Sequence, residues 1–290
     1  LSISNAVATN VSCSNDNSQI TVTATGGTPN YTYAYAKSPS TVPTSVYGTN
    51  PLTVDTNSGA DLVWDVYVKD ANDCTVKRTV TVISDAMPAI TAVVVGGQCT
   101  ASGSTFTITA TPSAGSLAPL SYGIAGPTGA FQSSATFTVA AGTYTVYIKD
   151  KNGCIVSAPA STTVYQQLTA GASVTKTLDC SASPDAVITT TIAGGKSPYT
   201  YTVKKGLGVV SAPSAPSASL SFTYSVSNAN ADDYTFVITD ANGCTSTTSA
   251  IVNPITNPTA TPTPTQVSCN GGGDGTVTLA GSGGSGGYTY

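Results

Sequence analysis

Apolar and polar residues alternate along short segments of this chain, which is the pattern of β-strands with one buried face. Near residue 20 apolar residues alternate with threonines, and a segment near residue 106 repeats the pattern. The residues expected to face a core in these segments are Ile20, Val22, Ala24, Phe106, Ile108 and Ala110. A later strand recurs three times, with core positions Trp64, Val66, Val68, Tyr144, Val146, Ile148, Tyr234, Phe236 and Ile238. The pattern predicts short strands around hydrophobic cores.

Each copy of the later strand continues into a turn and a cysteine, which indicates internal repeats. The turns read Asp-Ala-Asn-Asp-Cys, Asp-Lys-Asn-Gly-Cys and Asp-Ala-Asn-Gly-Cys, and they end at Cys74, Cys154 and Cys244. Asn and Gly tolerate positive φ angles, and an Asp carboxylate can accept hydrogen bonds from turn amides, so we predict a hairpin at each place. We call these three the trailing cysteines.

A second series of cysteines fixes the period of the repeats. These leading cysteines are Cys13, Cys99, Cys180 and Cys269, at steps of 86, 81 and 89 residues. A double-glycine motif, Gly-Gly followed by Tyr-Thr-Tyr, starts at residues 26, 194 and 283, and the second repeat keeps only a remnant of it at 118–122. We predict three complete repeats and the truncated start of a fourth, with the boundaries 6–84, 89–165, 172–252 and 262–290. Short Pro-containing junctions favour repeats arranged end to end.

Six or seven short strands per repeat, with Gly and Pro at the turns, predict an all-β chain of tandem immunoglobulin-like β-sandwiches. The leading cysteine ends the first strand and the trailing cysteine starts the last, and these strands commonly run side by side. We therefore predict one disulfide inside each repeat, and Cys269 is left unpaired because its repeat stops at Tyr290. Disulfides indicate an oxidising compartment outside the cytoplasm. The predicted pairs are Cys13–Cys74, Cys99–Cys154 and Cys180–Cys244.

Composition excludes several functions. The chain has no His and no Glu, so a Ser-His-Asp or Cys-His nucleophile and the usual zinc sites cannot form. Charged residues make up 8% of the chain and its net charge is −4, with no basic face for nucleic acid. The longest apolar runs fall far short of the roughly 20 residues that span a bilayer, so no membrane insertion is expected. We expect no enzyme, no catalytic residue and no cofactor.

Two kinds of side chain remain as candidate binding groups. Calcium needs six or more oxygen ligands, whereas most loops here offer a single Asp, so we favour a turn-stabilising role over a structural calcium ion. The aspartates concerned are Asp16, Asp70, Asp73, Asp150 and Asp240. Tyrosines on one strand face can stack on sugars or proteins, although half-buried strand positions explain them as well. This candidate binding surface consists of Tyr31, Tyr33, Tyr35, Tyr199 and Tyr201.

Tyr144 and Tyr234 occupy the place of the tyrosine-corner contact of sandwich domains. Trp64 stands at the equivalent position of the first repeat, and because its side chain has a different reach, we do not expect the same contact there.

The recurring Val-Ser-Cys, Gly-Gly-x-x-Pro-Tyr-x-Tyr and Asp-x-Asn-Gly-Cys motifs resemble the SprB-type repeat of giant bacterial cell-surface adhesins. The nearest matches are residues 269–275, 194–201 and 240–244. The second repeat departs by lacking the double glycine, and the first has Asp73 where the family has Gly. The resemblance implies a surface filament of gliding bacteria, exported by the type IX secretion system and moved along the cell by the gliding machinery. It carries over no catalytic residue.

Three functions fit the sequence. The first is a structural stalk or spacer in a secreted adhesin filament that supports adhesion and gliding motility, with neighbouring repeats of the chain as the partners. The second is a binding module that grips polysaccharide, the substratum or another protein through its tyrosines. The third is a spacer in a secreted polysaccharide-degrading enzyme.

Overall fold

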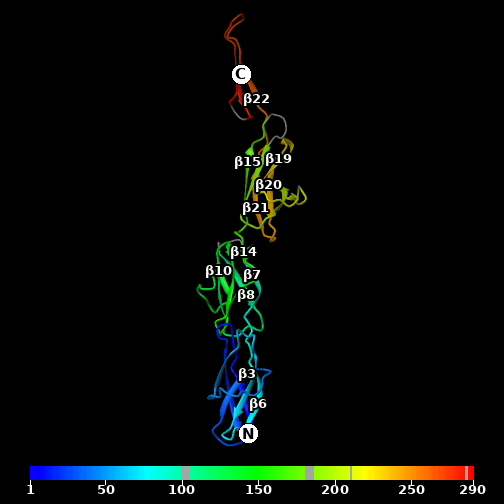
Figure 1. Ribbon diagram of the computed structural model, residues 1–290. Coiled ribbons are helices and arrows are strands. Elements are labelled where there is room, and N and C mark those ends of the chain that lie inside the picture. The colour runs from blue at the N-terminus through cyan, green and yellow to red at the C-terminus, as the bar shows by residue number, and fades with distance from the viewer. Residues whose placement is uncertain (100–104, 180–185, 210, 285–286) are drawn as a thin grey trace. The chain divides into compact units, whose positions relative to one another are not determined.

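The computed structural model describes residues 1–99, 105–179, 186–209, 211–284 and 287–290. These residues form β-strands joined by turns, and their only helical element is the short 3-10 helix η1, Asn228–Asn230. The strands form small antiparallel sheets that pair face to face as sandwiches (Figure 1). The predicted all-β, immunoglobulin-like fold is therefore confirmed, apart from the position of its disulfides.

The first sandwich, blue to cyan in Figure 1, consists of two three-stranded sheets. One sheet has the order β1-β2-β4 and the other β3-β5-β6. The strands are β1 (Ser2–Ala8), β2 (Asn17–Thr25), β3 (Thr32–Lys37), β4 (Leu52–Asp55), β5 (Val63–Lys69) and β6 (Thr75–Thr81). The alternation seen in the sequence explains the layers, because Ile20 and Val22 of β2 and Val66 and Val68 of β5 are buried between them.

The second sandwich repeats this plan with shorter strands. Its sheets have the orders β10-β8-β7 and β13-β12-β9, and a further pair joins β11 to β14. The strands are β7 (Ile90–Gly96), β8 (Phe106–Pro112), β9 (Ser121–Gly123), β10 (Thr136–Val139), β11 (Gly142–Tyr144), β12 (Tyr147–Lys149), β13 (Ile155–Ser157) and β14 (Thr162–Val164). Phe106, Ile108 and Ile148 lie in its core.

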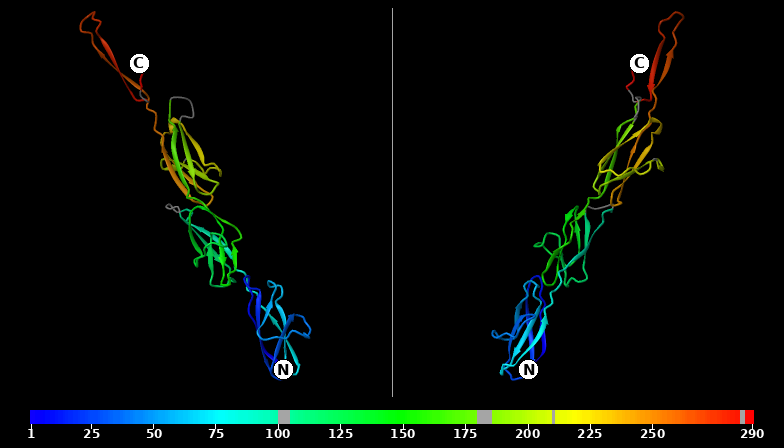
Figure 2. Two further views of the ribbon diagram at one scale, coloured as in Figure 1. Left: turned by 60° about the vertical axis from the view of Figure 1, so that its left-hand side comes forward. Right: turned by 45° about the vertical axis from the view of Figure 1, so that its right-hand side comes forward.

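The third sandwich has the sheet orders β15-β16-β19 and β18-β17-β20-β21. Its strands are β15 (Thr169–Lys176), β16 (Ala186–Ala193), β17 (Thr200–Lys205), β18 (Gly208–Val209), β19 (Ser221–Val226), β20 (Asp233–Thr239) and β21 (Thr245–Ile251). Phe236 and Ile238 of β20 are fully buried. A final hairpin follows, made of β22 (Thr259–Thr265) and β23 (Thr276–Ser282), and the two further views in Figure 2 show it as a separate ribbon pair in orange and red.

The buried apolar residues fall into three clusters, one in each sandwich. Contacts between Cα atoms divide the chain into two compact units, which are residues 1–96 with 105–164, and residues 97–104 with 165–290. The repeat boundaries that the sequence suggests stay predictions. No helix among the described residues is long and apolar enough to cross a membrane.

Candidate functional site

The trailing turns have the hydrogen bonds that the sequence predicts. In the third sandwich Asp240 Oδ1 accepts from the backbone N–H groups of Asn242 and Cys244, both at 2.9 Å. Asp70 and Asp150 hold the equivalent amides of their own turns at 2.9 to 3.0 Å. Each carboxylate is nearly buried, and it fixes the backbone from which the trailing cysteine projects. These aspartates therefore act as turn builders.

The double glycine positions the other oxygen of that carboxylate. Both Gly194 and Gly195 have φ near +68°, and a Cβ added to Gly194 would lie 2.1 Å from the carbonyl oxygen of Gln167. The chain thus passes directly over the residues that lead into β15, and the next amide, Lys196 N–H, donates to Asp240 Oδ2 at 2.8 Å. In the first sandwich Thr28 N–H makes the same bond at 3.0 Å, and this bond is the main reason why the pKa of Asp70 is lowered. In the first and third sandwiches the motif thus ties the trailing turn to the start of the repeat.

The leading cysteine lies at the opposite end of the first sandwich. Val11, two residues before Cys13, forms a parallel bridge with Ser84, just after the last strand. Val11 N–H donates to Ile83 O at 2.9 Å, and Asp85 N–H donates to Val11 O at 2.8 Å. The first and last strands of the sandwich therefore run in the same direction, so their ends meet at the place where the next repeat begins.

The cysteine pairing differs from the prediction. Cys13 is bonded to Cys154, with 5.7 Å between their Cα atoms, and Cys99 is bonded to Cys244, with 4.8 Å. The predicted pairs Cys13–Cys74, Cys99–Cys154 and Cys180–Cys244 are therefore wrong. Cys74 and Cys269 are exposed and free, and Cys180 lies outside the described residues. In both observed bonds the leading cysteine of one repeat joins the trailing cysteine of the next.

The direction of the first and last strands explains why the predicted cysteine pairing is wrong. The prediction placed the end of the first strand beside the start of the last strand, which holds only for antiparallel neighbours. These strands are parallel, so the whole length of β6 separates the two ends. Seven residues at about 3.3 Å each span roughly 23 Å, whereas the Cα atoms of a disulfide lie within about 7 Å of each other. A bond between Cys13 and Cys74 is therefore out of reach, whereas Cys13 lies within bonding distance of Cys154 in the next repeat.

Polar contacts surround the Cys13–Cys154 bond. Asp85 accepts from Asn10 Nδ2 at 2.7 Å and from Asn152 Nδ2 at 2.9 Å, so its carboxylate bridges the two sandwiches of this compact unit. The bond from Asn10, and then the bond from Asn152, lower the pKa of Asp85. Ser14 Oγ also donates to Asn152 O at 2.7 Å. Asn152 thus belongs to the trailing turn of the second sandwich and also to these contacts between the two sandwiches, which we call the joint.

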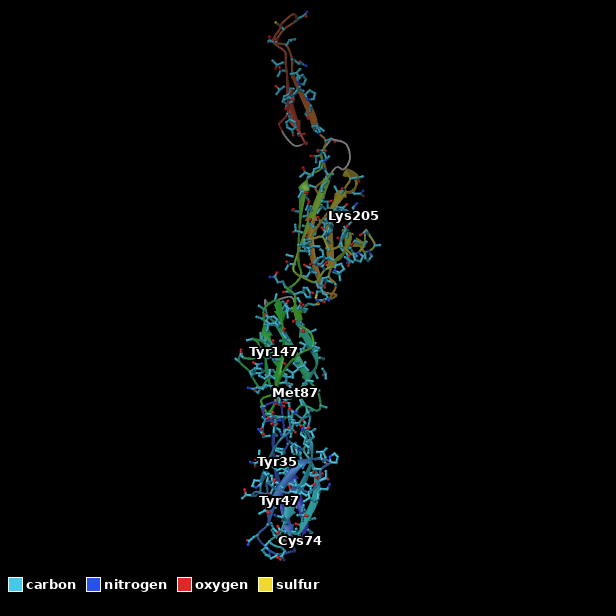
Figure 3. All side chains as sticks on the ribbon, viewed as in Figure 1. Tyr35, Tyr47, Cys74, Met87, Tyr147 and Lys205 are labelled. Carbon is cyan, nitrogen blue, oxygen red and sulfur yellow. A yellow bond between two sulfur atoms is a disulfide. The ribbon has the colours of Figure 1, made fainter. Side chains whose placement is uncertain are left out.

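A cavity of about 350 Å³ lies beside this joint. It is lined by Cys13, Asp16, Ser58, Asp85 and Met87, among others. Figure 3 labels Met87 and, at the other end of the same sandwich, the free Cys74. The lining mixes serine, aspartate and apolar side chains, and we assign no ligand to the cavity.

The Cys99–Cys244 bond has a different polar neighbour. The side chain of Gln98 pairs with the backbone of Tyr165. Its Nε2 donates to Tyr165 O and its Oε1 accepts from Tyr165 N–H, both at 3.1 Å. These two hydrogen bonds hold Gln98, the residue before the leading cysteine, against Tyr165, the residue after β14. The two joints thus share a connectivity and differ in the groups that support it.

The tyrosines of the candidate binding surface make mostly internal contacts. Tyr31 OH donates to Gly26 O at 2.7 Å, and Tyr199 OH donates to Gly194 O at 2.8 Å, so the first tyrosine of the motif closes the double-glycine turn. Tyr33 packs on the first core, and Tyr201 stacks on Phe222 with 3.7 Å between ring centroids. Tyr35 is 42% exposed and lies edge-on to Trp64. A binding role for these five residues stays a prediction.

The residue at the tyrosine-corner position donates to a nearby backbone carbonyl in all three sandwiches. Tyr144 OH donates to Ala140 O at 3.1 Å, and Tyr234 OH donates to Asn230 O at 2.7 Å. Trp64 Nε1 donates to Asp61 O at 3.0 Å, one residue nearer along the chain. Trp64 thus does not make the same contact as the tyrosines, but its indole N–H makes a related one to the carbonyl of the third residue before it.

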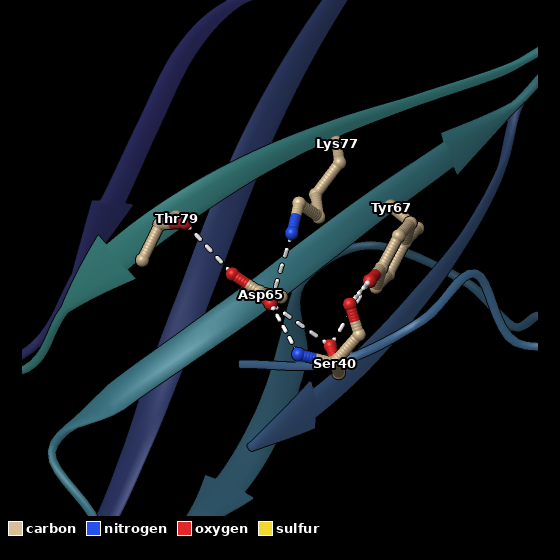
Figure 4. Close-up of polar contacts among 5 residues, drawn as sticks. All are labelled: Ser40, Asp65, Tyr67, Lys77 and Thr79. Atoms are coloured by element: carbon tan, nitrogen blue, oxygen red, sulfur yellow. Dashed lines mark hydrogen bonds and ion pairs between the residues drawn. The ribbon is translucent and has the colours of Figure 1, made fainter. Parts of the chain in front are cut away.

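Sequence reasoning missed a buried carboxylate, Asp65, on the outer side of β5 (Figure 4). Burial raises its pKa, but hydrogen bonds from Thr79 Oγ1 at 2.7 Å and from Ser40 N–H at 2.9 Å outweigh that effect and leave the pKa well below its usual range. Lys77 Nζ lies 3.3 Å away. The cluster fastens the loop after β3 to the sheet. Its only sequence signal is an Asp inside an apolar strand.

The aspartates weighed as calcium ligands are engaged in other contacts. Asp70, Asp150 and Asp240 each serve a separate turn, and Asp73 pairs with Lys69 at 2.9 Å. Asp16 uses its backbone carbonyl to accept from Thr56. No group of three or more His, Cys, Asp or Glu in the described part of the chain could hold a metal ion.

Comparison with protein families agrees with the motifs. The model of the SprB repeat matches residues 5–34 and 261–290, which contain Cys13 and Cys269 and both end in a double-glycine motif. The resemblance is thus confirmed at these two places, and no curated protein matches the sequence.

Solved structures give distant likenesses to this chain. A tetra-tandem repeat from the extending region of a large adhesion protein is 16% identical, with a TM-score of 0.31 over 96% of this chain and 88% of that one. A structure of a 1.5-MDa bacterial ice-binding adhesin is 14% identical, with a TM-score of 0.33 over 82% and 91%. Sidekick-1 immunoglobulin domains 1–5 are 15% identical, with a TM-score of 0.31 over 87% of this chain and 58% of that one, so the chain spans less than two thirds of that structure. At such scores we draw nothing about function from them.

Proposed function

We propose that this chain is a spacer segment of a long, secreted cell-surface adhesin, and that it takes no part in catalysis. The observation that supports this role is the pairing of a leading cysteine with the trailing cysteine of the following repeat. The SprB repeats at 5–34 and 261–290 support an adhesin as the parent protein. In this proposal the adhesin is exported by type IX secretion, serves surface adhesion and gliding motility, and meets polysaccharide or the substratum through other parts of its chain.

The cysteine pairing gives such a spacer a mechanical property. Between the Cys13–Cys154 bond and the Cys99–Cys244 bond the chain passes three times, along residues 13–99, 99–154 and 154–244. A pulling force on the termini is therefore shared by three parallel segments. The shortest has 55 residues (154 − 99), so even complete unfolding cannot separate the two bonds by more than about 190 Å at ~3.5 Å per residue. A reduced chain spans 231 residues (244 − 13), or about 800 Å.

Pulling single molecules by their termini measures this limit. Reduction of the bonds should add about 600 Å of extension between residues 13 and 244, which is the 176-residue difference at ~3.5 Å per residue. The variant Cys74→Ser serves as the matched control and should extend like the unmodified chain, because Cys74 is free. A longer extension of Cys74→Ser would contradict the observed pairing.

The spacer role itself is tested in the parent adhesin. Deleting the segment should reduce cell attachment, because the adhesin loses reach, while replacing it with the same number of unrelated sandwich repeats should restore attachment. A replacement that leaves cells unattached would instead assign binding to these repeats. Binding of the isolated chain to a panel of surface polysaccharides would have the same meaning, and Tyr35 would then be the first residue to replace.

A further inference from the structure

The three trailing cysteines occupy one kind of turn, but they differ in what they bind. Cys154 and Cys244 are bonded and are 3% and 4% exposed, whereas Cys74 is exposed and free. In all three turns the cysteine N–H donates to the Asp carboxylate at 2.9 Å. Asp73 also takes a positive φ of 61°, as the glycines of the other two turns do. The first turn is thus built like those that carry a disulfide.

The two bonded copies identify the partner. In each of them the trailing cysteine is joined to the leading cysteine of the preceding repeat. Cys74 cannot take the leading cysteine of its own repeat, because Cys13 lies at the other end of the sandwich and is already bonded to Cys154. We propose that Cys74 is the attachment site for another SprB-type repeat, which docks by its leading-cysteine loop and forms a disulfide with Cys74. Every repeat would then be linked to the next by the same kind of disulfide, from a leading cysteine to the following trailing cysteine.

A second copy of this chain offers a suitable donor. Cys269 is a leading cysteine that is exposed and free, and Val267-Ser268-Cys269 repeats the Val11-Ser12-Cys13 sequence of the bonded loop. It lies inside the second match to the SprB repeat model. The proposal therefore predicts a directional link, in which Cys269 of one copy meets Cys74 of the next.

The chemistry is thiol–disulfide exchange with an external oxidant. The Cys74 thiolate attacks one sulfur of a small disulfide such as oxidised glutathione, forms a mixed disulfide and releases one glutathione thiolate. The leading-cysteine thiolate of the docking repeat then attacks the Cys74 sulfur and releases the second glutathione. Two protein thiols are oxidised and one glutathione disulfide is reduced to two thiols. Outside the cytoplasm a dithiol oxidase would supply the same oxidising equivalents.

The test uses the full chain with Cys180→Ser, incubated in a glutathione redox buffer and digested without reduction for mass spectrometry. We expect Cys74–Cys269 links between copies to exceed the symmetric links, Cys74–Cys74 and Cys269–Cys269, by about tenfold. A second variant, Cys74→Ser with Thr75→Cys, keeps an exposed thiol one residue along the chain. It should link to Cys269 about tenfold less, because its sulfur leaves the turn on the other side.

Several results would overturn the proposal. Symmetric links in equal or larger amounts would show that the two thiols only collide at random. Equal linking by the Thr75→Cys variant would show that the turn presents nothing specific, and exchange to an internal Cys13–Cys74 bond would assign Cys74 to its own repeat. A complete lack of links would also refute it. The inference rests on the two observed disulfides, so attachment assays on the parent adhesin can fail or succeed independently of it.

Discussion

The trailing turns of the second and third sandwiches share a design and differ at one oxygen atom. Asp150 and Asp240 each hold two turn amides through Oδ1. Asp240 Oδ2 accepts a third bond, from Lys196 N–H, whereas Asp150 Oδ2 is buried without a hydrogen-bond partner. A buried carboxylate oxygen without a donor costs stability, so the second repeat carries a penalty that the third avoids.

The missing bond follows from the missing double glycine. In the third repeat Gly194 and Gly195 turn the chain so that the next amide points at the carboxylate, and in the first repeat Gly26 and Gly27 do the same. The second repeat has Gly115-Ser116 at this place, and the next residue, Leu117, still accepts from Lys151 N–H through its carbonyl oxygen at 3.2 Å. The loop therefore reaches the turn without the double glycine, but it does not present an amide to the second oxygen.

The largest effect expected from this comparison is that of Gly194→Ala. The added Cβ would meet Gln167 O at 2.1 Å in a backbone of positive φ, so the segment before β15 has to move. We expect the third sandwich to lose about 3 kcal/mol or more, measured by amide exchange of β20 and β21. Gly243→Ala is the matched control, because its φ is +81° and its surroundings are open, and it should cost only about 1 kcal/mol. Equal losses would mean that close approach to Gln167 plays no part.

The next largest effect is a difference in stability loss between the same substitution at Asp240 and at Asp150. Asp240→Asn replaces one carboxylate oxygen by an NH2 group that must face an amide donor, so we expect a loss of about 2 kcal/mol in the third sandwich. Asp150→Asn can place its NH2 group where Oδ2 has no partner, and it should change the second sandwich by less than about 0.5 kcal/mol. Urea unfolding followed by amide exchange in β12 and β20 separates the two. A larger loss from Asp150→Asn would reverse the comparison.

The smallest expected effect is a loss of stability of the first sandwich at acidic pH. Hydrogen bonds lower the pKa of Asp70, that of Thr28 N–H most, so its contribution to stability is present above the unfolded pKa of about 4 and is lost as the pH falls toward the folded value. We expect β6 of the first sandwich to become less protected from exchange below about pH 4. Asp70→Asn should flatten that dependence in β6, and an unchanged acid response would assign it to other groups, Asp65 first.

The joint should respond to acid in the same direction. The pKa of Asp85 is lowered by Asn10 and then by Asn152, so protonation below about pH 4 weakens this bridge while the Cys13–Cys154 bond stays in place. The expected result is faster amide exchange at Asn10–Val11 at pH 3 than at pH 6, after correction for intrinsic rates. Asp85→Asn should exchange fast at both pH values. If the variant behaves like the unmodified chain, Asp85 does not support the joint.

Local patterns predicted the strands and turns well, because each depends on residues close in sequence. The buried face of β5 and the carboxylate of Asp240 could be read from alternation and from turn chemistry. The cysteine pairing could not, since it depends on whether two distant strands run parallel, and the spacing of Cys13 and Cys74 is compatible with either direction. The different reach of the Trp64 side chain could be expected from the sequence, whereas its acceptor, the Asp61 carbonyl, could not.

The overlap of the two disulfide loops also bears on how the segment survives outside a cell. Because three stretches of polypeptide join the Cys13–Cys154 bond to the Cys99–Cys244 bond, a protease that cuts a surface loop in one of them leaves both halves attached. Two cuts in different stretches still leave one covalent path. Severing the molecule between these bonds takes a cleavage in each of the three stretches, so damage accumulates before the connection is lost.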